Sequence, residues 1–251
     1  MEKAKVTARV RSQEKIAGGI YSMWIETGLA QAARPGQFIS VYSRDSARML
    51  PRPISLCEIK KDALRIVYRV VGEGTLEFSH YKAGDNIEIM GPLGNVFPLR
   101  DKKALLIGGG IGIPPMVELS RQLSGEIQIV AGYRDELFLT EELSAHGELY
   151  LATEDGSAGV KGTVLDAVRE HSLQAEVLYA CGPTPMLKAV KAFGEEQKIE
   201  TWLSLEERMG CGIGACLACV CQSKEVDGHS HVHNKRICKD GPVFLAGEVE
   251  L

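Results

Sequence analysis

The stretch KALLIGGGIGIPPM, Lys103–Met116, decides how the middle of this chain folds. An apolar run typical of a buried strand ends in a cluster of glycines. Pro114 and Pro115 then open the run PPMVELSRQL, and prolines suit the first turn of a helix, where no backbone hydrogen bond is lost. The stretch therefore predicts a strand, a tight glycine turn and a helix.

The same alternation continues towards Leu205. The segments IQIVAGY, ELYLAT, VLYACG and ETWLSL read as strands, and TEELSAH, TVLDAVREH and TPMLKAVKAFGEEQ read as helices between them. Strands that alternate with helices at this spacing form parallel sheets. We predict a domain over residues 101–204 with a parallel sheet and helices on both of its faces.

The region before this domain has a different pattern. KVTARVRS, QFISVYSR, ALRIVYRVV and DNIEIMG are short strand-like runs separated by glycine or proline, and only TLEFSHY resembles a helix. Short strands with such turns indicate an antiparallel barrel or sandwich. This first predicted domain covers residues 1–100.

The region from Leu205 onwards, residues 205–251, is rich in cysteine and glycine. Its stretch EERMGCGIGACLACVC, Glu206–Cys221, holds four of the seven cysteines in the chain. Apolar residues are too few here for an independent core, so the segment needs a metal or disulfide to hold it together. We predict a small third domain.

The spacing of these cysteines indicates the kind of staple. Cys211, Cys216 and Cys219 follow the pattern C-x4-C-x2-C, with Cys238 further on. That spacing is the plant-type pattern for a [2Fe–2S] cluster. Structural zinc is the alternative, although zinc sites usually pair two short C-x2-C knuckles. Cys221 is interpreted as a packed small residue rather than a fifth ligand.

Three histidines, His229, His231 and His233, lie between Cys219 and Cys238. Alternate residues of a strand face the same way, so a metal site is conceivable there. A solvated hairpin is the simpler interpretation, and the sequence does not assign these histidines a role.

Composition excludes several classes of function. The chain has 251 residues, 45% hydrophobic and 25% charged, with a net charge of −4. A nucleic-acid partner would usually require a basic face. There is no apolar run long enough to span a membrane, and MEKAKVTARVRSQEK has no apolar stretch typical of a secretory signal. We therefore expect a cytoplasmic protein.

Several loops of the second predicted domain come together at one edge of its sheet. The glycines after Ile107 and the sequence CGP at Cys181–Pro183 both follow strands and precede helices, where open α/β sheets bind nucleotides. The loop TEDGSAGVKG brings Asp155 and Lys161 to the same edge. A tight structural turn is the competing interpretation for the glycines alone.

In the first domain, Arg52 stands just before a strand. It is followed by Pro53 and Ser55, and a second stretch, VYRVVGEGT, ends in Gly74 and Thr75. An arginine can bind phosphate through two N–H groups at once. Taken singly, each feature is also compatible with a surface arginine or a hairpin turn.

In order along the chain, RPIS, GT, GGGIGIPPM and CGPTPM resemble the ferredoxin–NADP reductase superfamily. With ERMGCGIGACLACVC and CKDGPVFLAGEVEL added, the whole chain resembles the electron-transfer subunits of NAD-linked dihydroorotate dehydrogenases. The resemblance implies an FAD-binding barrel, a domain that presents NAD to the flavin, and a C-terminal [2Fe–2S] domain.

The resemblance also assigns roles to residues. It implies that FAD is bound by Arg52, Pro53, Ile54, Ser55, Val67, Tyr68, Arg69, Gly74 and Thr75. It implies that NAD is bound by Gly109, Gly110, Gly112, Cys181 and Gly182, and the cluster by Cys211, Cys216, Cys219 and Cys238. The family spans the gap that corresponds to Cys219–Cys238 with fewer residues, so the histidine tract looks like an insertion. Arg134 stands beside Asp135 and Glu136, so this stretch offers both basic and acidic side chains. The preference for NAD over NADP therefore rests chiefly on the resemblance.

The implied function is electron transfer in pyrimidine (UMP) biosynthesis. Electrons from dihydroorotate, taken up by FMN on a separate catalytic subunit, reach NAD through the cluster and FAD, and two copies of each subunit assemble. We identify no group in this chain that would abstract a proton from dihydroorotate, so we expect that the chain alone does not oxidise dihydroorotate. Alternatives are a related subunit of a sulfhydrogenase, sulfite reductase or transhydrogenase, and a zinc-stapled binding module without redox function.

Overall fold

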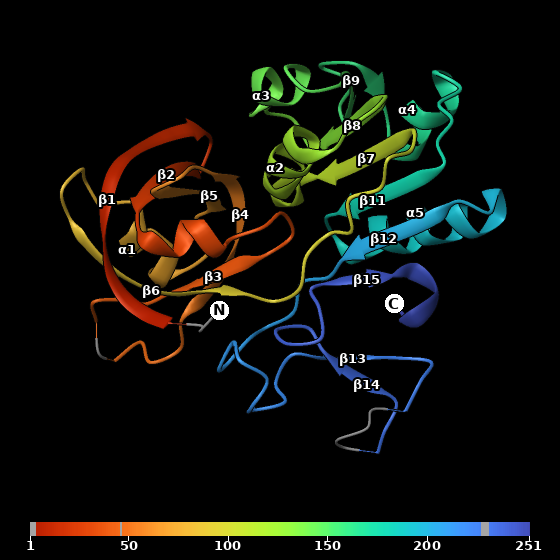
Figure 1. Cartoon of the computed structure of the whole chain (residues 1–251). Helices are drawn as coiled ribbons and strands as arrows, with labels where there is room; N and C mark the ends of the chain where they lie inside the picture. The colour runs from red at the N-terminus through yellow and green to blue at the C-terminus, as the bar shows by residue number, and fades with distance from the viewer. Residues whose placement is uncertain (1–3, 46, 227–230) are drawn as a thin grey trace.

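The computed structural model describes residues 4–45, 47–226 and 231–251. A closed barrel, a sheet flanked by helices and a cysteine-containing extension follow one another along the chain (Figure 1). This architecture confirms the predicted fold class. No helix in the described ranges has the length and apolar character needed to cross a membrane.

Six antiparallel strands close into the barrel in the order β1-β2-β5-β4-β3-β6. Alternate side chains point inwards and form an apolar core with Phe78 of the short helix α1. The sequence alone left a sandwich open, and ring closure settles the choice. The elements are β1 (Ala4–Ala17), β2 (Ile20–Glu26), β3 (Phe38–Val41), β4 (Arg52–Ile59), β5 (Ala63–Arg69), α1 (Glu73–Phe78) and β6 (Asn86–Leu93).

The sheet of the second region has the order β10-β9-β8-β7-β11-β12-β15. One apolar core lies beneath α2 and α3, and another beneath α4 and α5, so helices cover both faces as predicted. The strands are β7 (Ala104–Gly109), β8 (Ile127–Tyr133), β9 (Glu148–Thr153), β10 (Val160–Lys161), β11 (Val177–Cys181), β12 (Glu200–Ser204) and β15 (Val243–Leu245). The helices are α2 (Pro114–Gln122), α3 (Thr140–Ser144), α4 (Val164–Glu170) and α5 (Thr184–Gln197).

The edge strand β15 differs from the sequence-based expectation, in which the sheet ended at Leu205. It comes from the cysteine-containing segment and runs antiparallel to β12, with Ser204 opposite Val243 and Trp202 opposite Leu245. Three residues after Pro242 are too few to show any hydrophobic period. The boundaries 1–100, 101–204 and 205–251 stay predictions, and the third segment contributes a strand to the sheet of the second.

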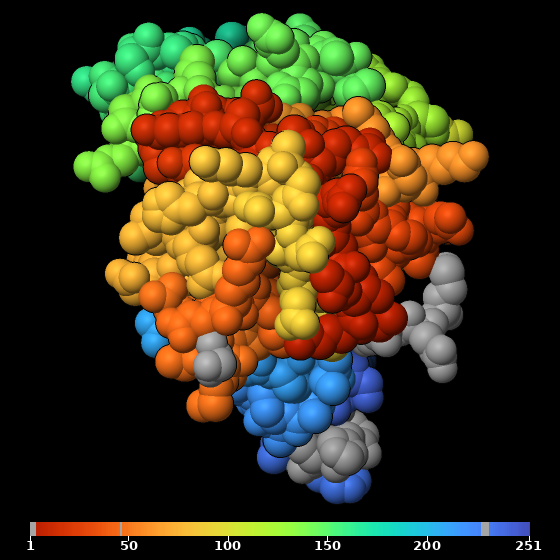
Figure 2. Space-filling model, turned by 90° about the vertical axis from the view of Figure 1, so that its left-hand side faces the viewer, coloured from red at the N-terminus to blue at the C-terminus, as the bar shows by residue number. Residues whose placement is uncertain are grey.

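Buried charge fixes the barrel against the sheet. Glu118 of α2 is fully buried and accepts the backbone N–H of Ile59 at the end of β4 at 2.9 Å. Arg121 donates to Glu118 and to the Ile59 carbonyl at 2.7 Å. In Figure 2 the barrel occupies the middle of the face shown, between the green helical region above and the blue C-terminal segment below. These bonds prevent the two regions from sliding past each other.

The cysteine-containing extension has little regular structure. Its strands β13 (Val220–Gln222) and β14 (Asn234–Arg236) form a two-stranded antiparallel hairpin. His231 and His233 are exposed beyond these strands, and the His233 ring contacts the Lys224 carbonyl at 3.1 Å. His229 lies outside the described residues.

Candidate functional site

The strand order of the sheet reverses between β7 and β11, and the nucleotide-binding loops predicted from sequence meet there. A Cβ at Gly112 would overlap the Cys181 carbonyl, and one at Gly109 would overlap the Met186 side chain. Gly182 packs against Gly109. The structure thus brings these glycines and Cys181 together at the carboxyl edge of the sheet, where only residues without side chains allow such close approach.

The Cys181 thiol lies half-buried at this edge. Burial raises the pKa of Cys181 to about 12, and the Ser204 hydroxyl offsets only part of that rise. The thiol is therefore neutral at physiological pH, and it presents a compact, uncharged surface. Such a group behaves as a small apolar side chain and can pack against another apolar surface.

In the barrel, Arg52 and Gly74 meet although they come from β4 and α1. The Arg52 guanidinium lies so close to Gly74 that a Cβ there would overlap it, and Arg52 also donates to the Leu50 carbonyl. Glycine at position 74 thus lets a guanidinium lie against the first turn of α1. Arginine and the unpaired N–H groups of a helix start both favour a phosphate.

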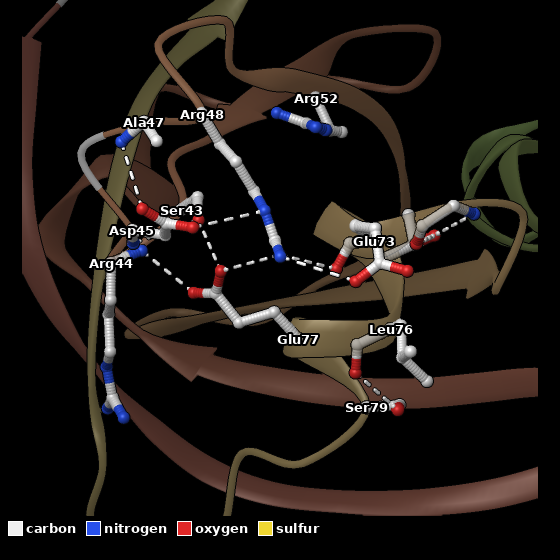
Figure 3. Close-up of polar contacts among 12 residues, drawn as sticks. Ser43, Arg44, Asp45, Ala47, Arg48, Arg52, Glu73, Leu76, Glu77 and Ser79 are labelled. Atoms are coloured by element: carbon white, nitrogen blue, oxygen red, sulfur yellow. Dashed lines mark hydrogen bonds and ion pairs between the residues drawn. The ribbon is translucent and has the colours of Figure 1, made fainter.

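Sequence reasoning missed an ionic network beside Arg52 (Figure 3). Arg48 donates to the Glu73 carbonyl at 2.9 Å and pairs with the Glu73 and Glu77 carboxylates at 3.3 and 3.5 Å. Glu77 also accepts the Arg44 backbone N–H at 2.8 Å and the Ser43 hydroxyl. The network ties the β3–β4 loop to α1. No spacing in the sequence predicts it, because the loop and the helix are far apart along the chain.

Strand alternation decides which other barrel residues face outwards. On β4, Pro53 and Ser55 are half-exposed while Ile54 points into the barrel core. On β5, Tyr68 is buried and donates to the Gln13 side chain at 2.8 Å, and Val67 faces the sheet region. The side chains of Ile54 and Tyr68 therefore shape the barrel from within, and these two residues can touch a ligand only through their backbone.

Thr75 is used locally. Its hydroxyl donates to the Gly72 carbonyl at 3.0 Å and accepts the Val71 N–H at 3.0 Å. These bonds shape the turn that leads into α1 and leave the backbone of Gly74 and Thr75 as the part that a ligand can approach. Arg69, at the end of β5, is exposed.

Backbone amides in the cysteine loop point at thiol sulfurs. Cys211 Sγ accepts N–H groups from Ile213, Ala215 and Cys216 at 3.5, 3.2 and 3.4 Å. Cys238 Sγ accepts the Gly214 N–H at 3.1 Å, and Cys219 Sγ accepts that of Cys238 at 3.4 Å.

The Cys211 N–H also reaches Cys216 Sγ at 3.4 Å, so each of the four predicted ligands accepts a backbone N–H, and Cys211 bonds Cys216 as Cys238 bonds Cys219. Within the residues described, no three cysteine, histidine or carboxylate side chains are arranged to hold a single metal ion. The donor set, four thiols bonded by amides that would stabilise sulfur charge, fits an iron–sulfur cluster.

The electrostatics of Cys211 agree with this use. Burial raises its pKa, but the N–H groups of Ile213, Cys216 and Ala215 outweigh burial and lower the pKa to about 6. The thiolate therefore dominates at neutral pH, and the thiolate is the form that binds metal. Cys221, by contrast, donates to the Lys235 carbonyl at 3.5 Å, and burial raises its pKa to about 11.

The cysteine loop lies directly against strands β3 and β6 of the barrel. A Cβ at Gly212 would come within 2.9 Å of Ser40 Oγ and 3.3 Å of Leu93. Ser40 is paired with Pro53 in the β3–β4 register. One strand pairing therefore separates the loop that carries Cys211 from the strand that carries Pro53 and Ser55.

This combination defines a class of protein: a flavin- and nicotinamide-dependent reductase with an attached iron–sulfur domain. Solved structures agree. A chain of the NADH-dependent reduced ferredoxin–NADP oxidoreductase is 30% identical, with a TM-score of 0.87 over 97% of this chain and 89% of that one. The ferredoxin reductase of carbazole 1,9a-dioxygenase shares the fold at 19% identity, with a TM-score of 0.68 over 79% of this chain and 67% of that one.

The family follows from sequence relatives. Residues 206–250 match the model of the iron–sulfur cluster binding domain of dihydroorotate dehydrogenase B. The dihydroorotate dehydrogenase B (NAD(+)) electron transfer subunit of Geobacillus kaustophilus is 46% identical over 96% of this chain and 97% of its own. The subunit of the same name from Bacillus velezensis is 44% identical over the whole of both chains.

The chain belongs to the family of electron transfer subunits of dihydroorotate dehydrogenase B. It is an oxidoreductase subunit whose cofactors are FAD and an iron–sulfur cluster, with NAD as the nicotinamide partner. The resemblance inferred from sequence is confirmed, and the zinc-stapled module is excluded by the family match.

Proposed function

We propose that this chain carries electrons between a dihydroorotate-oxidising, FMN-containing partner subunit and NAD, with two copies of each subunit in the complex. Oxidation of dihydroorotate to orotate on the partner releases two electrons and two protons. The electrons pass one at a time through the cluster to FAD, and NAD leaves with both electrons and one proton as NADH. The second proton goes to solvent, so the reaction balances.

The observation that carries this proposal is the contact between Gly212 and Ser40. It places the cysteine loop one strand pairing away from Pro53, on the face of β4 that Ser55 shares. At the other end of β4, the Ile59 N–H donates to Glu118 of α2, the helix that follows the glycine turn. A flavin on this face of β4 would therefore lie between the cysteine loop and the helix that follows the nucleotide-binding turn.

In this proposal Arg52 and the backbone at Gly74 and Thr75 hold the FAD pyrophosphate. Pro53, Ile54 and Ser55 line the flavin ring, and Val67, Tyr68 and Arg69 follow its ribityl chain. Gly109, Gly110, Gly112, Cys181 and Gly182 seat the nicotinamide nucleotide. Cys211, Cys216, Cys219 and Cys238 bind the [2Fe–2S] cluster, and the amide contacts to their sulfurs support this assignment.

The partner docks at the cysteine loop. Ile213 and Leu217, between Cys211 and Cys219, keep 45% and 44% of their surface exposed. Exposed apolar side chains around a redox centre suit a protein contact better than solvent. Electron transfer also requires the donor flavin to approach the cluster closely, which makes this surface the natural contact.

Two measurements test the proposal. The chain, loaded with cofactors, is expected to oxidise NADH with an artificial acceptor and to leave dihydroorotate unchanged. The complex captured through a tag on the chain is expected to reduce NAD with dihydroorotate and to contain FMN. Turnover of dihydroorotate by the chain alone, or a captured complex without FMN, would contradict the proposed division of labour.

A further inference from the structure

Asn95 lies where the three regions of the chain meet. It follows β6 by two residues, and its backbone N–H donates to the Gly241 carbonyl at 2.6 Å. Its side-chain amide donates to the Asp240 and Val243 carbonyls at 3.1 and 2.7 Å and accepts the Val243 N–H at 2.9 Å. One barrel residue thus bonds four backbone groups in the segment that follows Cys238.

The amide of Asn95 is suited to this position as other side chains are not. It offers two donors and an acceptor in one plane, so it pairs with both the N–H and the carbonyl of Val243 as a neighbouring strand would. Leucine has a similar size but makes none of these bonds. Aspartate keeps the acceptor, but its carboxylate would face the carbonyls of Asp240 and Val243, where the amide now donates.

The segment held by Asn95 is connected rigidly to Cys238. The N–H groups of Lys239, Asp240 and Gly241 all reach the Arg236 carbonyl, at 3.0, 2.7 and 3.4 Å, which closes a tight turn around Cys238. Cys238 therefore lies inside a turn whose second half is the segment that Asn95 bonds.

On the barrel side, Asn95 follows β6, which is joined through β3 to the proposed flavin strand β4. Leu93, two residues earlier, ends β6 and contacts the cysteine loop at Gly212. Leu93 is paired with Phe38 of β3, and Phe38 with Ser55 of β4. The end of β6 therefore contacts both parts of the cysteine-containing segment and lies two strand pairings from Ser55.

We propose that Asn95 is a positioning residue for electron transfer: its amide fixes the Cys238 side of the cluster at a set separation from the flavin strand β4. The inference rests on the proposed function, since it takes Cys238 as a ligand and β4 as the flavin strand. Asn95 itself contacts neither the flavin nor the cluster in the proposed arrangement. It acts through the backbone of residues 240–243.

The test separates two steps in the full-length chain loaded with FAD and cluster. NADH is mixed with the protein, flavin reduction is followed by absorbance, and cluster reduction by electron paramagnetic resonance of rapidly frozen samples. In Asn95→Leu, flavin reduction is expected to stay within about twofold, while cluster reduction per intact cluster slows about tenfold or more, as misplaced reacting groups do. Asn95→Asp keeps the acceptor for the Val243 N–H but sets a carboxylate against the carbonyls of Asp240 and Val243, and it is expected to slow the same step as well.

Asn86→Leu, at the exposed start of β6, is the matched control and is expected to leave both steps unchanged. If Asn95→Leu fails to retain its cluster, the Asp variant decides. Unchanged cluster reduction in a variant with full iron content would overturn the inference, as would equal slowing of both steps. A wild-type cluster that NADH never reduces would instead refute the proposed function.

Discussion

The barrel's cofactor cradle and the cysteine loop are built in opposite ways. The cradle residues are fixed by strand register and by ion pairs, so Arg52, Arg48 and Glu77 hold their places through the protein's own contacts. Cys219 and Cys238 are buried in the core of the sheet region, but residues 213–218 of the cysteine loop are exposed or half-buried, and the loop's N–H groups are directed at sulfur. We infer that the barrel site around Arg52 is formed before its cofactor binds, whereas the cysteine loop depends on its cofactor to hold it together.

The largest effect is expected from removing a proposed cluster ligand. Cys216→Ser removes one of four thiolates, and a small domain held together by metal loses its main source of stability with the metal. Iron per chain is expected to fall close to zero while FAD content stays near that of the wild type. Iron assay and flavin absorbance on the same sample measure both. Loss of FAD together with iron would show that the two sites are not built independently.

The opposite result, weaker FAD binding with unchanged iron content, is expected from a substitution in the barrel. In the proposed site, Arg52→Met removes a charge-assisted bond to the FAD pyrophosphate worth about 1.5–3 kcal/mol, and it is expected to weaken FAD binding about tenfold to a hundredfold. Iron content is expected to remain unchanged. Flavin fluorescence during titration of the flavin-free chain measures the affinity.

Arg11→Met provides the control for this substitution. Arg11 pairs with Glu26 and Asp62 on the exposed barrel surface, where an ion pair contributes little. FAD affinity that falls equally in both variants would assign the effect to net charge rather than to the Arg52 position.

A smaller, pH-dependent effect is expected at Glu77. Burial raises the pKa of Glu77, but the Ser43 hydroxyl, the Arg44 N–H and the Tyr81 hydroxyl outweigh burial and lower the pKa below 4.5. A carboxyl group with a lowered folded-state pKa stabilises the fold above its unfolded pKa, and this stability is lost as pH falls through the folded value.

Glu77→Gln is therefore expected to lower the free energy of unfolding by about 1 kcal/mol at neutral pH. The difference from the wild type should shrink as the pH falls below 4.5. Urea unfolding curves of both proteins across that range provide the measurement. A difference that is constant with pH would mean that the charge of Glu77 does not hold the loop.

The smallest effect is expected at Cys221, which lies two positions from Cys219 but bonds the Lys235 carbonyl. Cys221→Ser keeps a donor at that carbonyl, so iron content and the visible spectrum should match the wild type within error. Iron loss comparable to that of Cys216→Ser would place Cys221 among the ligands and displace one of the four assigned thiols.

Much of this molecule could be predicted because its signals are local. The spacing of Cys211, Cys216 and Cys219 and the glycines of the β7–α2 turn are short patterns that the chemistry of one cofactor or one turn imposes. The alternation of strands and helices from Lys103 to Leu205 is likewise readable in short windows. These features indicated the fold class and the cofactors.

The remainder could not be predicted because it joins distant residues. Arg48 meets Glu73 and Glu77 across a loop, and Asn95 bonds Val243 over a separation of 148 residues. Neither pair has a period or motif that marks it. Strand β15 is three residues long and is recognisable only once β12 offers an open edge to pair with.

That edge strand also has a consequence for the synthesis of the protein. Every other strand of the sheet precedes β15 in the chain, so the sheet leaves the ribosome with β12 as an unpaired edge, a surface on which strands of other chains can add. A chain cut short before Val243 would keep that adhesive edge for good, and it would lack the segment just after Cys238 as well. Truncated products should therefore be insoluble or degraded rather than persist as flavoproteins without a working cluster.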